Sequence, residues 1–103
     1  MLLPKTVQVG PKLYTIELQE RLIAQAEAKA LLGECSTATT TLRFDPSYPK
    51  RLTDTLLHEV LHAIDFEYKL DLDHDVLDRL TNALLDTLQR NQLSFVEDFT
   101  IDE

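Results

Sequence analysis

The chain has 103 residues, of which 44 % are hydrophobic, a size and composition typical of one globular domain with a modest core. It carries 18 acidic against 10 basic residues, a formal net charge of −8, with no cluster of Lys and Arg. These properties exclude a disordered chain and argue against nucleic-acid binding, and no stretch approaches the roughly 20 apolar residues that a membrane span needs.

The first third of the chain predicts a hairpin followed by a helix. Residues 7–9 and 13–18 contain alternating apolar and β-branched side chains on either side of a Gly-Pro dipeptide, which is typical of a turn between two strands. From residue 19 to 32 apolar residues recur at helical spacing among Ala, Glu, Gln and Lys. Gly33 stands where a helix C-cap is expected, so we expect a helix over 19–32.

One further strand and two helices follow. The threonine-rich segment 36–45, in which two large apolar residues alternate with polar ones, is the strongest strand candidate. Helical periodicity over residues 50–69 and 74–91 predicts two helices, assigned to the segments 46–69 and 73–91. Asp73 stands at the expected N-cap of the second helix. An acidic tail occupies 92–103. These segments form one predicted domain that covers all 103 residues, with the strands and the first helix before residue 46.

The segment His58-Glu59-Val60-Leu61-His62 has the His-Glu-x-x-His spacing of zinc-dependent hydrolases and lies inside a predicted helix. Four residues apart on a helix, His58 and His62 place both imidazoles on one face, where two ring nitrogens can reach one zinc ion at about 2.0–2.1 Å. Bound zinc lowers the pKa of water towards roughly 7, and Glu59 is near enough to take its proton and pass it to a leaving amine. The motif therefore predicts two metal ligands and a general base.

A catalytic zinc site needs a third protein ligand besides water, and the motif does not supply it. The metzincin pattern is excluded, because Asp65 and Tyr68 occupy the places of its glycine and its last histidine. An antiparallel second helix would bring its first residues towards the end of the first helix, so His74 is the favoured third ligand, followed by Asp78 and then Asp75. The same residues also suit a solvated helix N-terminus, where acids interact favourably with the helix dipole.

Two further side chains near the motif have open assignments. Asp65 shares the histidine stripe, so it either orients a histidine ring or is an exposed helix acid. Cys35, the single cysteine, cannot form an internal disulfide, and we interpret it as a small, partly buried side chain rather than a nucleophile. The lone cysteine, together with a start that lacks the apolar run of a signal peptide, predicts a cytoplasmic protein.

The stretch from Thr53 to Asp65 resembles the active-site helix of small phage-encoded zincin-like proteins, which are distant relatives of the ImmA/IrrE-type metallopeptidases. In that group the third ligand is a glutamate on the following helix. In this chain His74 stands at that position, so a histidine replaces the glutamate. The residues that share the spacing of the group's second helix are Leu77, Leu80, Thr81, Leu84 and Leu85.

The resemblance extends over about residues 40–88, and its specific part is the His-Glu-x-x-His motif. It implies a minimal zincin-like fold of the α+β class, in which a small twisted sheet packs on the motif helix and a following antiparallel helix. It places a zinc ion between the helices. It also implies a peptidase that acts on a polypeptide in the cytoplasm of a bacterial or phage-infected cell.

Two functions are compatible with the sequence. The first is a zinc-dependent metallopeptidase with Glu59 as general base and His58, His62 and His74 as metal ligands. The second is a catalytically inactive zincin-like module whose acidic surface binds a phage or host protein. The intact Glu59 favours the enzyme, because a purely structural zinc site needs no general base.

Overall fold

The chain folds into a mixed sheet of four strands, a separate pair of short strands and two helices, which confirms the predicted α+β class. The more specific zincin-like arrangement stays a prediction.

None of the helices in the described part of the chain is long and apolar enough to cross a membrane. The computed structural model describes residues 3–20, 23–24, 29–30, 33–47 and 51–93.

The predicted hairpin is confirmed. Strands β1 (Thr6–Val9) and β2 (Lys12–Leu18) pair in antiparallel orientation, with Val9 opposite Lys12 at the turn. Gly10 begins the turn with a φ of 56°, a left-handed conformation that glycine adopts without a steric penalty. The hairpin forms one side of the four-stranded sheet.

The segment 36–45 differs from its prediction as a single strand. It contains the end of β5 (Gly33–Ser36), then a turn, then β6 (Thr41–Phe44), which pairs antiparallel with β5 and parallel with β2. The hydroxyl groups explain the turn: the Thr39 hydroxyl donates to Ser36 Oγ at 2.8 Å, and such local hydrogen bonds compete with strand pairing. The sheet order is therefore β1-β2-β6-β5, with β5 at one edge.

The predicted helix over 19–32 is wrong where the structure describes this segment. Strands β3 (Ile23–Ala24) and β4 (Lys29–Ala30) pair in antiparallel orientation as a separate small sheet. Gly33 is the first residue of β5 rather than a helix C-cap. Helix propensity amounts to at most about 0.7 kcal/mol per ordinary residue, so tertiary context overrides it easily. The parts of the predicted helix outside the described residues are 21–22, 25–28 and 31–32.

Helix α1 (Leu52–Glu67) confirms the predicted motif helix, although it begins at Leu52 and residues 46–47 form a turn. It covers the sheet, where it contacts β1, β5 and β6. Tyr14 of β2 is fully buried beneath it and donates a 2.6 Å hydrogen bond from its hydroxyl to Glu67. The buried positions of α1 recur every three or four residues and therefore share one face. They are Leu52, Leu56, Glu59 and Ala63.

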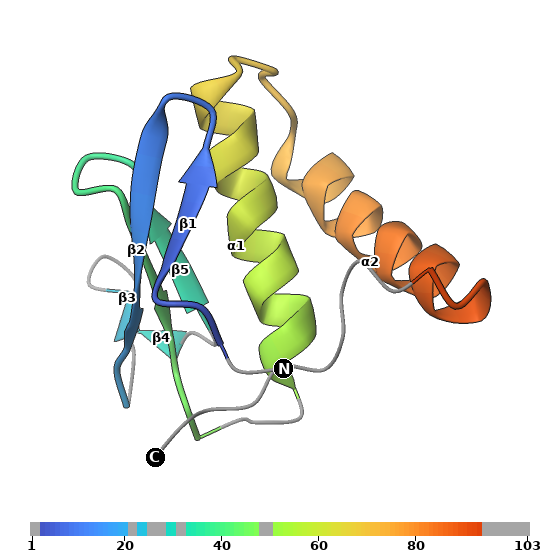
Figure 1. Ribbon diagram of the computed structural model, residues 1–103, viewed down its shortest axis with the longest axis horizontal. Coiled ribbons are helices and arrows are strands. Elements are labelled where there is room, and N and C mark those ends of the chain that lie inside the picture. The colour runs from blue at the N-terminus through green and yellow to red at the C-terminus, as the bar shows by residue number, and fades with distance from the viewer. Residues whose placement is uncertain (1–2, 21–22, 25–28, 31–32, 48–50, 94–103) are drawn as a thin grey trace.

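Helix α2 (His74–Arg90) confirms the second predicted helix and packs on α1, which lies between it and the sheet (Figure 1). Leu77 and Thr81 are its buried residues. Asp73 is the N-cap residue, as predicted, although its side chain makes no capping hydrogen bond. Of the predicted tail 92–103, residues 94–103 lie outside the described residues.

The loop between the two helices sets the start of α2. Lys69 and Asp71 have φ angles of 55° and 56°, which allow the chain to reverse over a short distance. Asp65 Oδ1 on α1 accepts a 3.0 Å hydrogen bond from the Leu72 backbone N–H. This hydrogen bond joins the loop to α1, and α2 then begins with His74 close to the two motif histidines.

Gly33 marks a close approach between β5 and α1. A Cβ at this position would lie 2.7 Å from Thr55 Cγ2, and 3.1 Å from Arg43 O and Phe44 Cδ1. We expect Gly33→Ala to lower the free energy of unfolding by about 1–3 kcal/mol, measured by denaturant titration. The double variant Gly33→Ala/Thr55→Ser removes the nearest methyl group and should recover part of the loss. A Gly33→Ala protein as stable as wild type would contradict this packing.

Candidate metal centre

His58 and His62 lie one turn apart on α1, and their Nε2 atoms face one another at 3.1 Å. Their ring centroids are 4.7 Å apart, with the ring planes at 80°. Two nitrogens that bind one tetrahedral zinc ion at 2.0–2.1 Å are separated by about 3.3 Å. The observed separation is close to that value, so the two motif histidines are arranged as a pair of ligands to one ion would be.

His74, the first residue of α2, joins this pair. Its ring centroid lies 5.6 Å from that of His58 and 5.3 Å from that of His62. One ring nitrogen from each histidine lies within 4.8 Å of the other two. These are all three histidines of the chain. The structure thus brings together the three residues that were predicted as ligands from two separate helices.

Asp78, the second choice for a third ligand, lies beside the histidines. Its Oδ1 is 3.3 Å from His58 Nδ1 and its Oδ2 is 3.2 Å from His74 Nδ1. Asp75, the third choice, has a side chain that is 79 % exposed and pairs with Arg79 at 3.1 Å. The structure therefore brings Asp78 to the cluster and leaves Asp75 in solvent.

Asp65 lies near the same cluster, yet its carboxylate holds the loop. Oδ1 accepts the Leu72 N–H described above, and the side chain is half-buried. The sequence left two roles open for Asp65, an exposed helix acid or a residue that orients a histidine ring. The side chain is not exposed, and its hydrogen bond goes to the Leu72 backbone rather than to a histidine ring. Its negative charge also acts on His62, where it opposes the lowering of the pKa by burial.

Glu59 is buried, with 7 % of its surface exposed, and lines the same cleft as the histidines. Burial raises its pKa from 4.5 to about 7, and the negative charges of Glu34 and Asp78 act in the same direction. A carboxyl group with a pKa near neutrality can accept a proton and return it at physiological pH. Such a perturbed acid in a cleft is a candidate functional group.

Burial lowers the pKa of both motif histidines. Asp78 opposes this shift at His58, while His74 adds to it; at His62 the neighbouring His58 adds to it. The rings of His58 and His62 are therefore disposed to be neutral at physiological pH. A neutral imidazole is the form that binds a metal ion.

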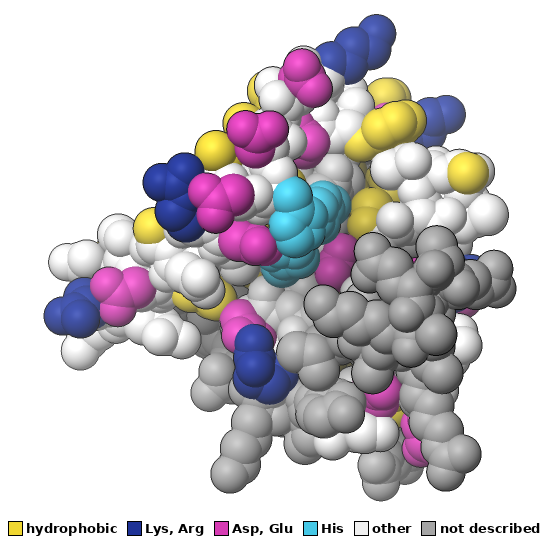
Figure 2. All heavy atoms as spheres, turned by 180° about the vertical axis from the view of Figure 1, so that it is seen from behind, with side chains coloured by type: hydrophobic (Ala, Val, Ile, Leu, Met, Phe, Trp, Pro, Cys, Tyr) yellow, Lys and Arg dark blue, Asp and Glu magenta, His cyan; other side chains and the backbone are white. Residues whose placement is uncertain are grey.

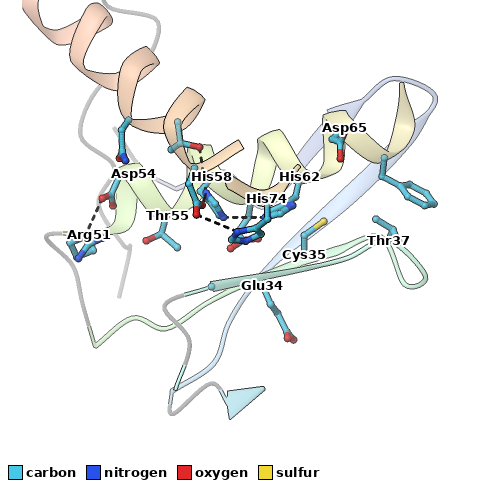
Figure 3. Close-up of a pocket in the computed structure, with 16 residues that line it drawn as sticks. Glu34, Cys35, Thr37, Arg51, Asp54, Thr55, His58, His62, Asp65 and His74 are labelled. Atoms are coloured by element: carbon cyan, nitrogen blue, oxygen red, sulfur yellow. Dashed lines mark hydrogen bonds and ion pairs between the residues drawn. The ribbon is translucent and has the colours of Figure 1, made fainter. Parts of the chain in front are cut away.

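The cluster opens into a cleft of about 820 Å³ between β5, α1 and α2 (Figure 3). This volume lies in the range of about 300–1,000 Å³ that is usual for ligand sites. Figure 2 shows the histidine side chains at the surface with acidic side chains around them. Arg51 is the basic residue of the lining and pairs with Asp54 at 3.1 Å. The acids of the lining are Glu34, Asp54, Glu59, Asp65 and Asp78.

Cys35 of β5 also lines the cleft and is half-buried, which confirms the expected small, partly buried side chain. Burial raises the pKa of its thiol to about 11, and the charges of Glu59 and Glu67 add to the shift. A thiol with this pKa stays protonated at neutral pH, whereas the thiolate is the nucleophilic form. Cys35 is therefore not disposed to act as a nucleophile.

Comparison with protein-family models, with curated proteins and with solved structures finds no match for this chain. The geometry also gives Thr81 a place at the site, whereas the sequence analysis named it only for its spacing on the second helix. Thr81 is buried, and its hydroxyl oxygen lies 3.4 Å from His58 Nδ1. Its signal in the sequence is the spacing of three from Asp78, which puts both side chains on one face of α2.

Proposed function

We propose that this chain is a zinc-dependent metallopeptidase of the zincin kind, similar to the small phage-encoded relatives of the ImmA/IrrE-type enzymes. The observation that carries the proposal is the cluster of His58, His62 and His74 in a cleft that also contains the buried Glu59. Structural zinc sites fill all four positions with Cys and His, whereas three histidines beside a buried acid suit a site that keeps one position open.

The donor set fits zinc. Imidazole nitrogen is a preferred zinc ligand, and His58 and His62 already present their Nε2 atoms at a suitable separation. One ring nitrogen of His74 lies within 4.8 Å of a ring nitrogen of each motif histidine, which places it near enough to serve as the third ligand. Zinc bound there would supply a Lewis acid that polarises the scissile carbonyl and lowers the pKa of water.

Glu59 moves the proton in the proposed reaction. It takes one proton from the attacking water as the water oxygen bonds to the scissile carbonyl carbon. When the carbon–nitrogen bond breaks, Glu59 returns that proton to the leaving amine, so a new carboxyl group and a new amine result. Its pKa of about 7 suits both transfers, because an acid–base group works best when its pKa is near the operating pH.

The place of the cleft favours a polypeptide as the substrate. The cleft runs beside β5, which is last in the order of the four-stranded sheet. Edge strands present backbone N–H and C=O groups with which an extended peptide can pair. We infer that a peptide lies along β5 with its scissile bond near the histidine cluster.

The charge of the protein favours one alternative function. A net charge of −8 and the acidic lining of the cleft suit a catalytically inactive zincin-like module that binds a basic partner protein. This module would bind its partner without cleaving it. Its binding would also be insensitive to Glu59→Gln, which keeps the shape of the side chain.

Elemental mass spectrometry on the untagged protein tests the proposal directly. We expect about one zinc per chain in the wild-type protein and loss of zinc in His74→Ala, because that change removes one of three ligands. The matched control is Asp75→Ala, a change in the first turn of the same helix whose carboxylate pairs with Arg79. Wild-type protein without metal, even after zinc is added, would overturn the peptidase and leave the acidic module as the better account.

A further inference from the structure

Asp78 contacts two of the three proposed ligands at once. Its Oδ1 lies 3.3 Å from Nδ1 of His58 on α1, and its Oδ2 lies 3.2 Å from Nδ1 of His74 on its own helix. In His58 the other ring nitrogen, Nε2, is the atom that faces His62. One carboxylate therefore joins the histidines of two helices through their Nδ1 atoms.

Thr81 determines where His58 carries its proton. The Thr81 hydroxyl donates to the Leu77 carbonyl at 2.9 Å, so its oxygen is left to accept, and this oxygen lies 3.4 Å from His58 Nδ1. The carboxylate of Asp78 lies 3.3 Å from the same nitrogen and offers it an acceptor oxygen. Because both neighbours accept, Nδ1 holds the hydrogen and Nε2 keeps its lone pair.

The same carboxylate restrains His74. This ring is 69 % exposed at the start of α2, where a side chain ordinarily samples several rotamers. Asp78 follows four residues later on the same face of the helix, and its Oδ2 holds the ring through Nδ1. The contact therefore reduces the entropy that His74 loses when it binds an ion.

We propose that Asp78 is the positioning residue of this site. It holds His58 and His74 as Nδ1–H tautomers and directs their Nε2 atoms towards a common zinc ion. The inference rests on the proposed function and deepens it. Asp78, which the helical spacing alone offered as a possible ligand, is assigned to a place behind the ligands.

Zinc affinity, measured on the 103-residue chain by competition with a chelating indicator, tests this role. We expect Asp78→Ala to weaken zinc binding by about 10–100-fold, the usual cost of losing a carboxylate behind a ligand histidine. The absorption spectrum of the cobalt-substituted protein should shift as well, because the ring orientations change. Asp75→Ala removes the same charge from the same helix, and we expect it to leave the affinity and the spectrum unchanged.

Asp78→Asn separates hydrogen bonding from charge. The amide keeps one carbonyl oxygen for one of the two rings, so we expect a loss smaller than that of Asp78→Ala. Equal losses in Asp78→Ala, Asp78→Asn and Asp75→Ala would show a general charge effect and overturn the positioning role. Unchanged zinc affinity in Asp78→Ala would overturn it too, while zinc in the wild-type protein would leave the proposed function standing. Wild-type protein that binds no zinc would overturn both.

A second measurement needs no variant. Long-range ¹H–¹⁵N NMR spectra of the zinc-loaded wild-type protein report which ring nitrogen of each histidine carries hydrogen. We expect His58 and His74 as Nδ1–H tautomers. An Nε2–H tautomer in either ring would overturn the inference, whether or not the Asp78 variants fold.

Discussion

Replacing Glu59 with glutamine should lower peptide hydrolysis by about 10²–10⁴-fold while the zinc content stays at the wild-type level. Glutamine keeps the size of the side chain and cannot take a proton from water, so the reaction loses its base. The measurement is cleavage of a degenerate peptide library, read by mass spectrometry, beside elemental analysis of the same samples.

Glu17→Gln is the matched control for this experiment. It is the same substitution at an acid of β2 that does not line the cleft and that pairs with Arg43 at 3.2 Å. We expect it to keep most of the activity. A Glu59→Gln protein that cuts peptides as fast as wild type would refute the assignment of the base. If wild-type protein holds zinc and cuts no peptide, the acidic binding module gains support.

In the metal-free protein, the difference in unfolding free energy between wild type and Glu59→Gln should depend on pH. The folded-state pKa of Glu59 is about 7 against 4.5 for the free side chain, so between these values the folded chain keeps a proton that the unfolded chain has lost. Stability relative to Glu59→Gln therefore falls as pH rises through this window, by about 3 kcal/mol once it is passed. Denaturant titration in the presence of a chelator at pH 4.5 and pH 8 measures the difference. No change between the two pH values would show that the carboxyl group is not shifted.

The second large effect is the loss of metal in His58→Ala or His62→Ala. Each change removes one of two nitrogens that face each other at 3.1 Å, and a pair of remaining ligands holds zinc weakly. At a zinc concentration about 100 times Kd, the wild-type protein gains about 2.7 kcal/mol of stability, which corresponds to a rise in melting temperature on the order of 10 °C. We expect neither variant to show this rise.

Thermal melts with zinc and with a chelator give the readout for these histidine variants. The relevant quantity is the difference between the two melts for each protein, so the cost of losing a half-buried ring cancels. Asn82→Ala, a change at another side chain that lines the cleft, serves as the control and should keep the full zinc response. A His62→Ala protein that is still stabilised by zinc to the wild-type extent would contradict the proposed ligand set.

Local patterns predicted the parts of the fold that depend on short-range periodicity. The hairpin of β1 and β2 and the helices α1 and α2 lie where alternation and helical spacing placed them. The segments 19–32 and 36–45 were mispredicted, the first as a helix and the second as one strand. In the first, helix propensity is weak and tertiary pairing overrides it. In the second, hydrogen bonds between neighbouring hydroxyls form a turn that strand propensity does not capture.

The candidate site likewise has one part that follows from local spacing and one part that depends on how the helices pack. The spacing of four residues was enough to predict that His58 and His62 share one face of a helix, with Glu59 beside them. The sequence left His74, Asp78 and Asp75 open, since their order depends on how α2 returns against α1. In the folded chain the loop that Asp65 holds brings His74 to the pair and places Asp78 against two ring nitrogens, while Asp75 faces solvent. The burial that raises the pKa of Glu59 to about 7 likewise arises only when α1 packs on the sheet, because a sequence pattern does not specify how much water a side chain loses.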